Sequence, residues 1–224
     1  MKLNPTKCKE MLTNFMSNHN FIVNPIVIGS NTIERVMTYK LLGVYVSNDL
    51  KWNHHVEVIV QKGNRRLYFL RVLKQCGAPP ASLAKVYTTI VRPVLEYAAP
   101  VWKNIPDFLS YKIESIQKRA MRIIFPLMNY NEALNALNLT TLSDRRAHLC
   151  QVYIDRLRNE NHPLHFMLPK QEEVVHNYNL RSGISRSTRP TCRTKRTQEF
   201  VTHKYIVACT IIFSSTYWIY CIIF

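Results

Sequence analysis

The sequence is poor in glycine, in paired cysteines and in paired aspartates, and each shortage excludes a kind of site. Only 5 glycines occur among 224 residues, and no two stand close enough to form a glycine-rich phosphate loop. The 6 cysteines are scattered without a CxxC pair, which excludes a dense disulfide scaffold and indicates reduced thiols in an intracellular protein. The first residues lack the apolar segment of a secretory signal.

Acidic residues are also scarce. The chain has 30 Lys and Arg against 14 Asp and Glu, for a net charge of +16 and a pI near 9.8. Such a surplus is typical of a protein that binds a polyanion, either nucleic acid or an anionic membrane surface, and charge alone does not choose between them. A hydrophobic content of 47% is enough to build an ordinary core, in one domain or slightly more.

The amino-terminal part has the pattern of short strands. Runs of β-branched and aromatic residues at 21–28, 32–36 and 39–46 are separated by turn residues. We therefore expect a small antiparallel sheet within a first region, residues 1–52.

Helical periodicity begins after this region and continues to about residue 168. The apolar spacing predicts helices over 54–75, from Pro80 to about 101, and over 106–125, 131–138 and 142–159. Pro93 predicts a kink in the second helix, and Thr141 or Ser143 is expected to cap the fifth. The buried face of the second helix is predicted to be Leu83, Tyr87, Ile90, Val94, Ala98 and Val101, and that of the fifth to be Leu142, Leu149, Tyr153 and Leu157. The fold class is therefore mainly α, a helical bundle over 53–168.

Two further segments complete the chain. Residues 169–204 are basic and rich in Ser, Thr and Pro, which predicts a disordered linker. Residues 205–224 carry no charge and are long enough to span a bilayer as a helix, with the preceding basic residues on the cytoplasmic side. The alternative is an accidental apolar extension, because polar residues such as Ser214 and Ser215 lie near its middle.

Several segments together resemble one family. NPTKCKEM at 4–11 and YKLLGVYVSNDLKWNHHV at 39–56 are followed by helical segments at 66–77, 86–102, 113–125 and 137–149. This order resembles the end of the palm and the thumb of LINE-type, non-LTR retrotransposon reverse transcriptases, over most of residues 3–165. The resemblance implies a fragment of an RNA-directed DNA polymerase with a helical thumb, whose partner is RNA or an RNA–DNA hybrid. The complete family enzyme uses divalent Mg.

The resemblance also implies roles for single residues. Lys7 matches the lysine of palm motif D, which approaches the triphosphate; the alternative is a solvated lysine at a frayed terminus. Leu42, Gly43 and Val44 match the primer-grip turn of motif E. The alternative there is an ordinary hairpin in which Leu42 and Val44 are buried.

The predicted helices supply the candidate nucleic-acid surface. Between residues 53 and 126, twelve basic residues stand against four acidic ones. A thumb of this kind could hold an A-form duplex through its phosphates, and the alternative is a set of solvated helix faces. The candidate binding residues are Lys62, Arg65, Arg66 and Arg71 on the first helix and Lys112, Lys118, Arg119 and Arg122 on the third.

The carboxylates that polymerisation needs are missing. Nucleotidyl transfer of this kind uses metal ions held by paired aspartates, and no Asp-Asp pair occurs anywhere in the chain. We assign no catalytic residue, no metal site and no cofactor, and expect a catalytically silent chain that begins partway through a longer reading frame. The competing hypothesis is a structural or membrane-associated remnant. We expect a location in the nucleus or cytoplasm, or a tail-anchored membrane form.

The same segments also resemble the region described as the amino-terminal domain of AlkB-homologue dioxygenases. An iron and 2-oxoglutarate enzyme needs two histidines and a carboxylate on one face, commonly as HxD with a distant His. The nearest pattern is His55-Val56-Glu57, in a predicted helix where positions two apart diverge. The adjacent His54 and His55 diverge as well, so we assign no metal to them.

Overall fold

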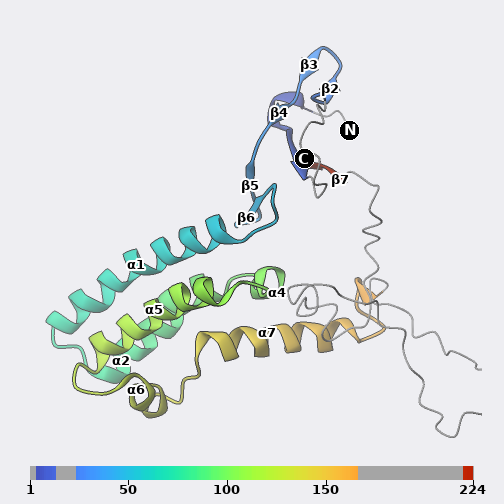
Figure 1. The fold of residues 1–224 in the computed structure, drawn as a ribbon. Coiled ribbons are helices and arrows are strands. Elements are labelled where there is room, and N and C mark those ends of the chain that lie inside the picture. Colours follow the sequence, from blue (N-terminus) through green and yellow to red (C-terminus); the bar gives the residue numbers. More distant parts are fainter. Residues whose placement is uncertain (1–3, 14–23, 166–218, 224) are drawn as a thin grey trace, which may run out of the picture. The chain divides into compact units, whose positions relative to one another are not determined.

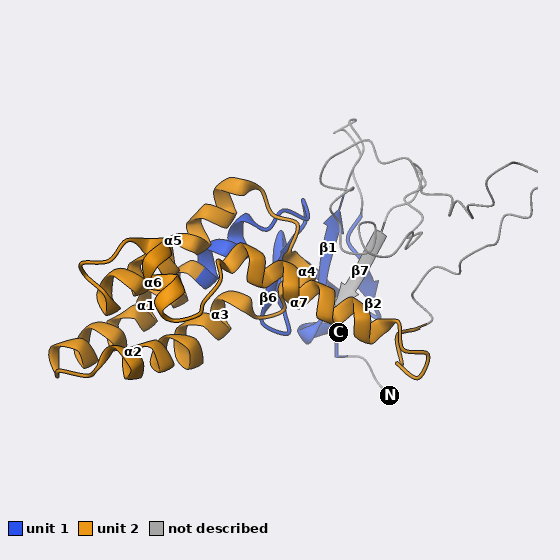
Figure 2. Ribbon diagram, turned by 90° about the horizontal axis from the view of Figure 1, so that it is seen from below, with its two compact units in different colours: residues 1–59, 212–224 blue, residues 60–211 orange. Residues whose placement is uncertain are grey.

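The computed structural model describes residues 4–13, 24–165 and 219–223 (Figure 1). These residues are mainly helical, with small sheets in the amino-terminal part, as the sequence predicts. The chain divides into two compact units, residues 1–59 with 212–224 and residues 60–211 (Figure 2).

Unit 1 contains a three-stranded sheet in the order β4-β1-β7. The short 3₁₀ helix η1 (Pro5–Lys7) leads into β1 (Lys9–Thr13), which pairs in parallel with β4 (Glu34–Arg35) and antiparallel with β7 (Ile219–Ile223). The carboxylate of Glu10 is buried and accepts hydrogen bonds from Arg35 Nη2 at 2.6 Å and from the backbone N–H of Ile26 at 2.9 Å. These charge-assisted hydrogen bonds connect β4 and the backbone of Ile26 to β1.

Two antiparallel hairpins complete unit 1. One joins β2 (Val27–Ile28) to β3 (Asn31–Thr32), and the other joins β5 (Thr38–Leu41) to β6 (Val44–Ser47). The expectation of one antiparallel sheet is therefore wrong, because the described strands form three small sheets, one of which has a parallel pair. The run 39–46 is interrupted because Leu42 and Gly43 have φ of 46° and 90°, a two-residue turn that only positive φ allows.

The first helix begins beside this second hairpin. In α1 (Asn53–Gln75), the buried His55 accepts a hydrogen bond through Nδ1 from the backbone N–H of Tyr45, at 3.3 Å. The contact links β6 to the first turn of α1 within unit 1.

Unit 2 is a helical bundle centred on α5 (Asp107–Ile124). This helix packs against α2 (Pro80–Val86), α6 (Tyr130–Ala136) and α7 (Leu142–Leu157) (Figure 1). It also approaches α1 closely, because a Cβ added to Gly63 would lie only 3.2 Å from Ile116 Cγ2 and 3.0 Å from Leu95 Cδ2. Glycine therefore lets two helices meet the middle of α1.

The second predicted helix is divided into four pieces. After α2 come a π-helical turn η2 (Tyr87–Val91), α3 (Arg92–Glu96) and, beyond the left-handed Ala98, α4 (Ala99–Trp102). The π turn inserts one extra residue, so the buried face moves one position along after Tyr87. Ile90 and Val101 are 39% and 54% exposed, against the expectation. The residues that are buried instead are Val91, Leu95, Ala99 and Trp102.

The fifth predicted helix, α7, begins as expected and buries a different face. The Thr141 side chain caps it by accepting a hydrogen bond from the backbone N–H of Asp144 at 3.1 Å. The buried line continues from Leu142 through Arg146, Cys150, Ile154 and Leu157, so the expected burial of Leu149 and Tyr153 is wrong. Arg146 accounts for the shift: its Nη2 donates to Ser110 Oγ at 2.5 Å and its guanidinium lies over the Trp102 ring. Burial lowers the pKa of this arginine and raises that of Cys150.

A chain of hydrogen bonds crosses the interior of unit 2. The Tyr87 hydroxyl donates to Gln117 Oε1 at 2.5 Å, and Gln117 Nε2 donates to the Tyr130 hydroxyl at 3.0 Å. Tyr130 in turn donates to Glu114 Oε1, and Glu114 Oε2 accepts the backbone N–H of Leu142 at 3.0 Å. The chain joins η2, α5, α6 and α7, so these polar groups specify how the helices are arranged.

The predicted linker, residues 169–204, and most of the apolar tail, residues 205–218, lie outside the described residues. Within the described ranges, no helix is both long enough and apolar enough to cross a membrane.

Candidate nucleic-acid interface

The eight basic residues named from the sequence lie on the surface of α1 and α5, in unit 2. Seven are exposed, and Arg66 is half-buried. Within the part of the chain that the structure describes, no ion pair joins any of the eight to a carboxylate. None of these eight charges is therefore held in a direct ion pair there, although Lys118 shares a pocket with Asp107 and Glu114.

The structure separates the four basic residues of α1. Since successive helical residues turn by about 100°, Lys62, Arg65 and Arg66 share one side. Arg71 is nine residues from Lys62 and lies on the opposite side, rotated by about 180°. Arg66 also donates to the backbone carbonyl of Ile90 in the π turn, so its guanidinium is held in place.

The basic residues of α5 are also divided. Lys112, Arg119 and Arg122 follow the solvent-facing side of the helix, at spacings of seven and three residues. Arg119 is fixed by hydrogen bonds to Ser115, at 3.2 Å to its carbonyl and 3.0 Å to its Oγ. Lys118 lies one helical turn before Arg122 and faces α6, with its ammonium 5.5 Å from the centroid of the Tyr130 ring.

The carboxylates of the bundle leave this surface positive. Glu96 is occupied by Arg145 at 3.1 Å and Arg92 at 3.5 Å, away from the eight residues. Glu114 is occupied by Tyr130 and by the backbone of Leu142. Exposed, unpaired cations on rigid helices are suited to contact phosphates without reading sequence.

The candidates in unit 1 differ in their exposure to solvent. Lys7 is exposed at the end of η1. Val44 is buried as expected, but Leu42 is 84% exposed, so the expectation that it is buried in the hairpin is wrong. Its position in a tight turn with positive φ directs the side chain away from the sheet contacts.

The histidines of α1 do not converge with a carboxylate. His55 is buried against β6, whereas His54 and Glu57 are exposed on other sides of the helix. The arrangement does not match the facial set of two histidines and a carboxylate that an iron dioxygenase needs.

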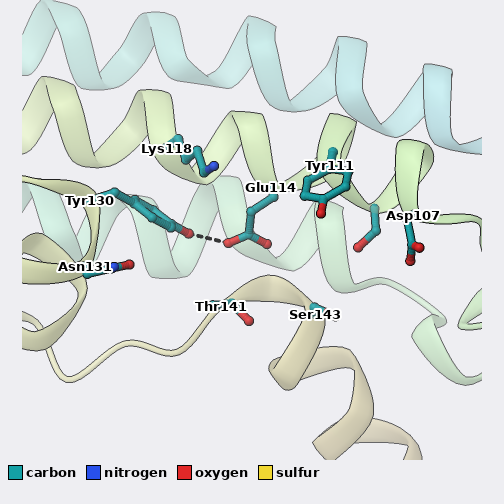
Figure 3. Close-up of a pocket in the computed structure, with 9 residues that line it drawn as sticks. Asp107, Tyr111, Glu114, Lys118, Tyr130, Asn131, Thr141 and Ser143 are labelled. Atoms are coloured by element: carbon teal, nitrogen blue, oxygen red, sulfur yellow. Dashed lines mark hydrogen bonds between the residues drawn. The ribbon is translucent and has the colours of Figure 1, made fainter.

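One polar pocket of about 380 Å³ was not found by sequence reasoning (Figure 3). It lies in unit 2 between one side of α5 and the first turns of α6 and α7. Its residues are far apart in the chain and form no motif; the only local signal was the capping position of Thr141. We call it the α5–α7 pocket, and it is lined by Asp107, Ser110, Tyr111, Glu114, Lys118, Tyr130, Asn131, Thr141 and Ser143.

No family model, no curated protein and no solved structure matches this chain. Its function therefore has to be inferred from its own residues.

Proposed function

We propose that the chain is the palm-end and thumb part of a LINE-type reverse transcriptase, and that it binds RNA or an RNA–DNA hybrid without catalysing nucleotide transfer. In this proposal the helical bundle over 53–168 is the thumb. The hairpin turn at Leu42 and Gly43 corresponds to the primer grip, where an exposed apolar side chain can contact a sugar.

One observation carries the binding role: the eight basic residues of α1 and α5 have no carboxylate partner among the described residues. Arg66 and Arg119 are additionally held by hydrogen bonds to the carbonyls of Ile90 and Ser115. Holding a cation in place reduces the entropy it loses on binding a phosphate. A solvated charged face would not need such anchoring.

The catalytic role is absent from the proposal because the sequence holds no adjacent aspartates. Asp107 and Asp144 lie in the first turns of α5 and α7, and Asp49 accepts hydrogen bonds from Ser47 and from the backbone of Lys51. These are structural positions rather than a shared metal site.

The proposal is tested by measuring affinity for a short RNA–DNA hybrid over a range of salt concentrations. Replacing Lys112, Arg119 and Arg122 together by Ala should weaken binding and reduce the slope of log K against log salt by about 2 to 3, since each phosphate contact contributes about 0.7 to 0.9. Affinity should hardly change with the base sequence of the hybrid.

The matched control removes three basic residues elsewhere in unit 2, by replacing Lys85, Arg156 and Arg158 with Ala. These residues are exposed on α2 and at the end of α7. The control loses the same net charge, so equal slopes for the two triple variants would show that overall charge, not the α5 surface, drives binding. No binding at any salt concentration would contradict the proposed function and favour the structural-remnant hypothesis.

A further inference from the structure

The α5–α7 pocket has a lining that suits a neutral ligand with hydrogen-bond donors. The lining includes two carboxylates, Asp107 and Glu114, and one ammonium, that of Lys118, and this balance of charge disfavours an anion (Figure 3). Lys118 already places its ammonium over the Tyr130 ring, so a second cation would be repelled there. What remains favourable is an uncharged group that donates hydrogen bonds.

The two carboxylates are too far apart to share one metal ion. Asp107 and Glu114 are seven residues apart on α5, about 10.5 Å along the helix. Two oxygens bound to one Mg or Ca lie within about 5 Å of each other. Tyr111 stands between them in the close-up, and no group of three metal-ligating side chains occurs among the described residues.

The spacing instead fits a ligand that has donors at both ends and a flat ring between them. Glu114 accepts one hydrogen bond at each oxygen, from Tyr130 and from the backbone of Leu142. Each carboxylate oxygen has a second lone pair, so Glu114 can accept further donors. Tyr111 is 70% exposed and offers its ring at the mouth of the pocket.

A nucleoside combines a flat ring with hydrogen-bond donors on its base and on its sugar. Its base can stack on a tyrosine ring, its amino groups donate to carboxylates, and its ribose hydroxyls donate and accept. Stacking on aromatic rings tolerates any base, which suits a binder that does not read sequence.

The pocket also adjoins the basic surface of α5. Lys118 lines the pocket and lies one helical turn before Arg122, and Tyr111 lies two turns before Lys118 on the same side. A strand whose phosphates contact Arg122 could therefore place one unpaired base at the pocket. We infer that the α5–α7 pocket binds a single unpaired nucleoside through Tyr111, Asp107 and Glu114; for a nucleoside within a strand, this rests on the proposed function.

The test uses the fluorescent base 2-aminopurine, first as the free riboside and then inside a single-stranded RNA. Stacking on Tyr111 should quench its fluorescence on addition of the protein. Tyr111→Ala should weaken the riboside or strand affinity about fivefold or more, the smaller end of measured stacking losses. Asp107→Ala removes both carboxylate acceptors and should also weaken the affinity. Both side chains are exposed, and circular dichroism checks that each variant keeps its helices.

The matched control is Tyr153→Ala, which removes a partly exposed tyrosine on α7 outside the pocket. Quenching only in the strand assigns the pocket to a nucleotide of bound RNA, and quenching of the free riboside assigns it to nucleosides in general. No quenching in either form, or equal effects of Tyr111→Ala and Tyr153→Ala, would overturn the inference.

Hybrid binding, measured on the same samples by anisotropy, separates this inference from the proposed function. Hybrid bound without quenching leaves the proposed function standing and removes the pocket's role. Quenching of the riboside without any hybrid binding supports the pocket's role and contradicts the proposed function.

Discussion

The buried pair Tyr87 and Gln117 offers a quantitative test of how unit 2 is held together. Tyr87 is 0% exposed and Gln117 is 1% exposed, and the tyrosine hydroxyl donates to Oε1 of the glutamine at 2.5 Å. Gln117 also donates to the Tyr130 hydroxyl and, at 2.9 Å, to the carbonyl of Thr140.

Replacing Gln117 by Leu leaves the Tyr87 hydroxyl buried without its acceptor and frees the Thr140 carbonyl. The unsatisfied buried hydroxyl costs about 1 to 3 kcal/mol. Thr140 is exposed, so its carbonyl can bind water instead, and the free energy of unfolding should fall by about 1 to 3 kcal/mol. Tyr87→Phe leaves only Gln117 Oε1 without its donor and should cost about 1 to 2 kcal/mol.

The double variant distinguishes this network from ordinary packing. With both partners replaced by apolar groups, neither Tyr87 nor Gln117 leaves an unsatisfied polar atom. The double variant should therefore lose about 1 to 2 kcal/mol less unfolding free energy than the two single variants lose together. Urea unfolding followed by far-UV circular dichroism measures all three, with Tyr68→Phe as a surface control. Losses that add to within about 0.5 kcal/mol would refute the reasoning.

Two further predictions concern alkaline stability and the hairpin of unit 1. Burial raises the pKa of Tyr87 and Tyr130 above the ordinary 10.0, so the two hydroxyls ionise more readily in the unfolded chain. The stability that they contribute is therefore fully present below pH 10 and is lost as the pH rises above it. Tyr87→Phe should reduce this alkaline loss of stability in urea titrations, and an unchanged pH profile would contradict the prediction. Leu42→Asn should relieve positive-φ strain of about 1 kcal/mol and slow amide exchange in β5 and β6; faster exchange would show that Leu42 makes a needed contact.

Helix positions could be predicted from local pattern. The helices over 53–75, 107–124 and 142–157 agree with the apolar spacing to within about two residues, the usual uncertainty of helix ends. Of the five residues that the apolar spacing aligns on one face of α5, Leu109, Ile113, Ile116 and Ala120 are buried and Ile123 is half-buried. An uninterrupted amphipathic helix has a single period, and that period can be read from the chain.

The faces of interrupted helices could not be predicted. Extrapolating the period of α2 past Tyr87 fails because the π turn adds one residue. The helix then ends at Glu96, and the left-handed Ala98 separates it from α4. Arg146 was not among the residues expected on the buried face of the fifth helix, although its guanidinium contacts Ser110 and Trp102 in the interior.

For the candidate sites, charge composition was enough to name the basic residues, because a charged side chain usually stays at the surface wherever the helix packs. How those residues divide between the sides of α1 and α5 follows from which stripe each helix buries. The α5–α7 pocket depends on three elements whose residues are separated by up to 36 positions, from Asp107 to Ser143. Only tertiary packing brings them together, because no local interaction links their backbones.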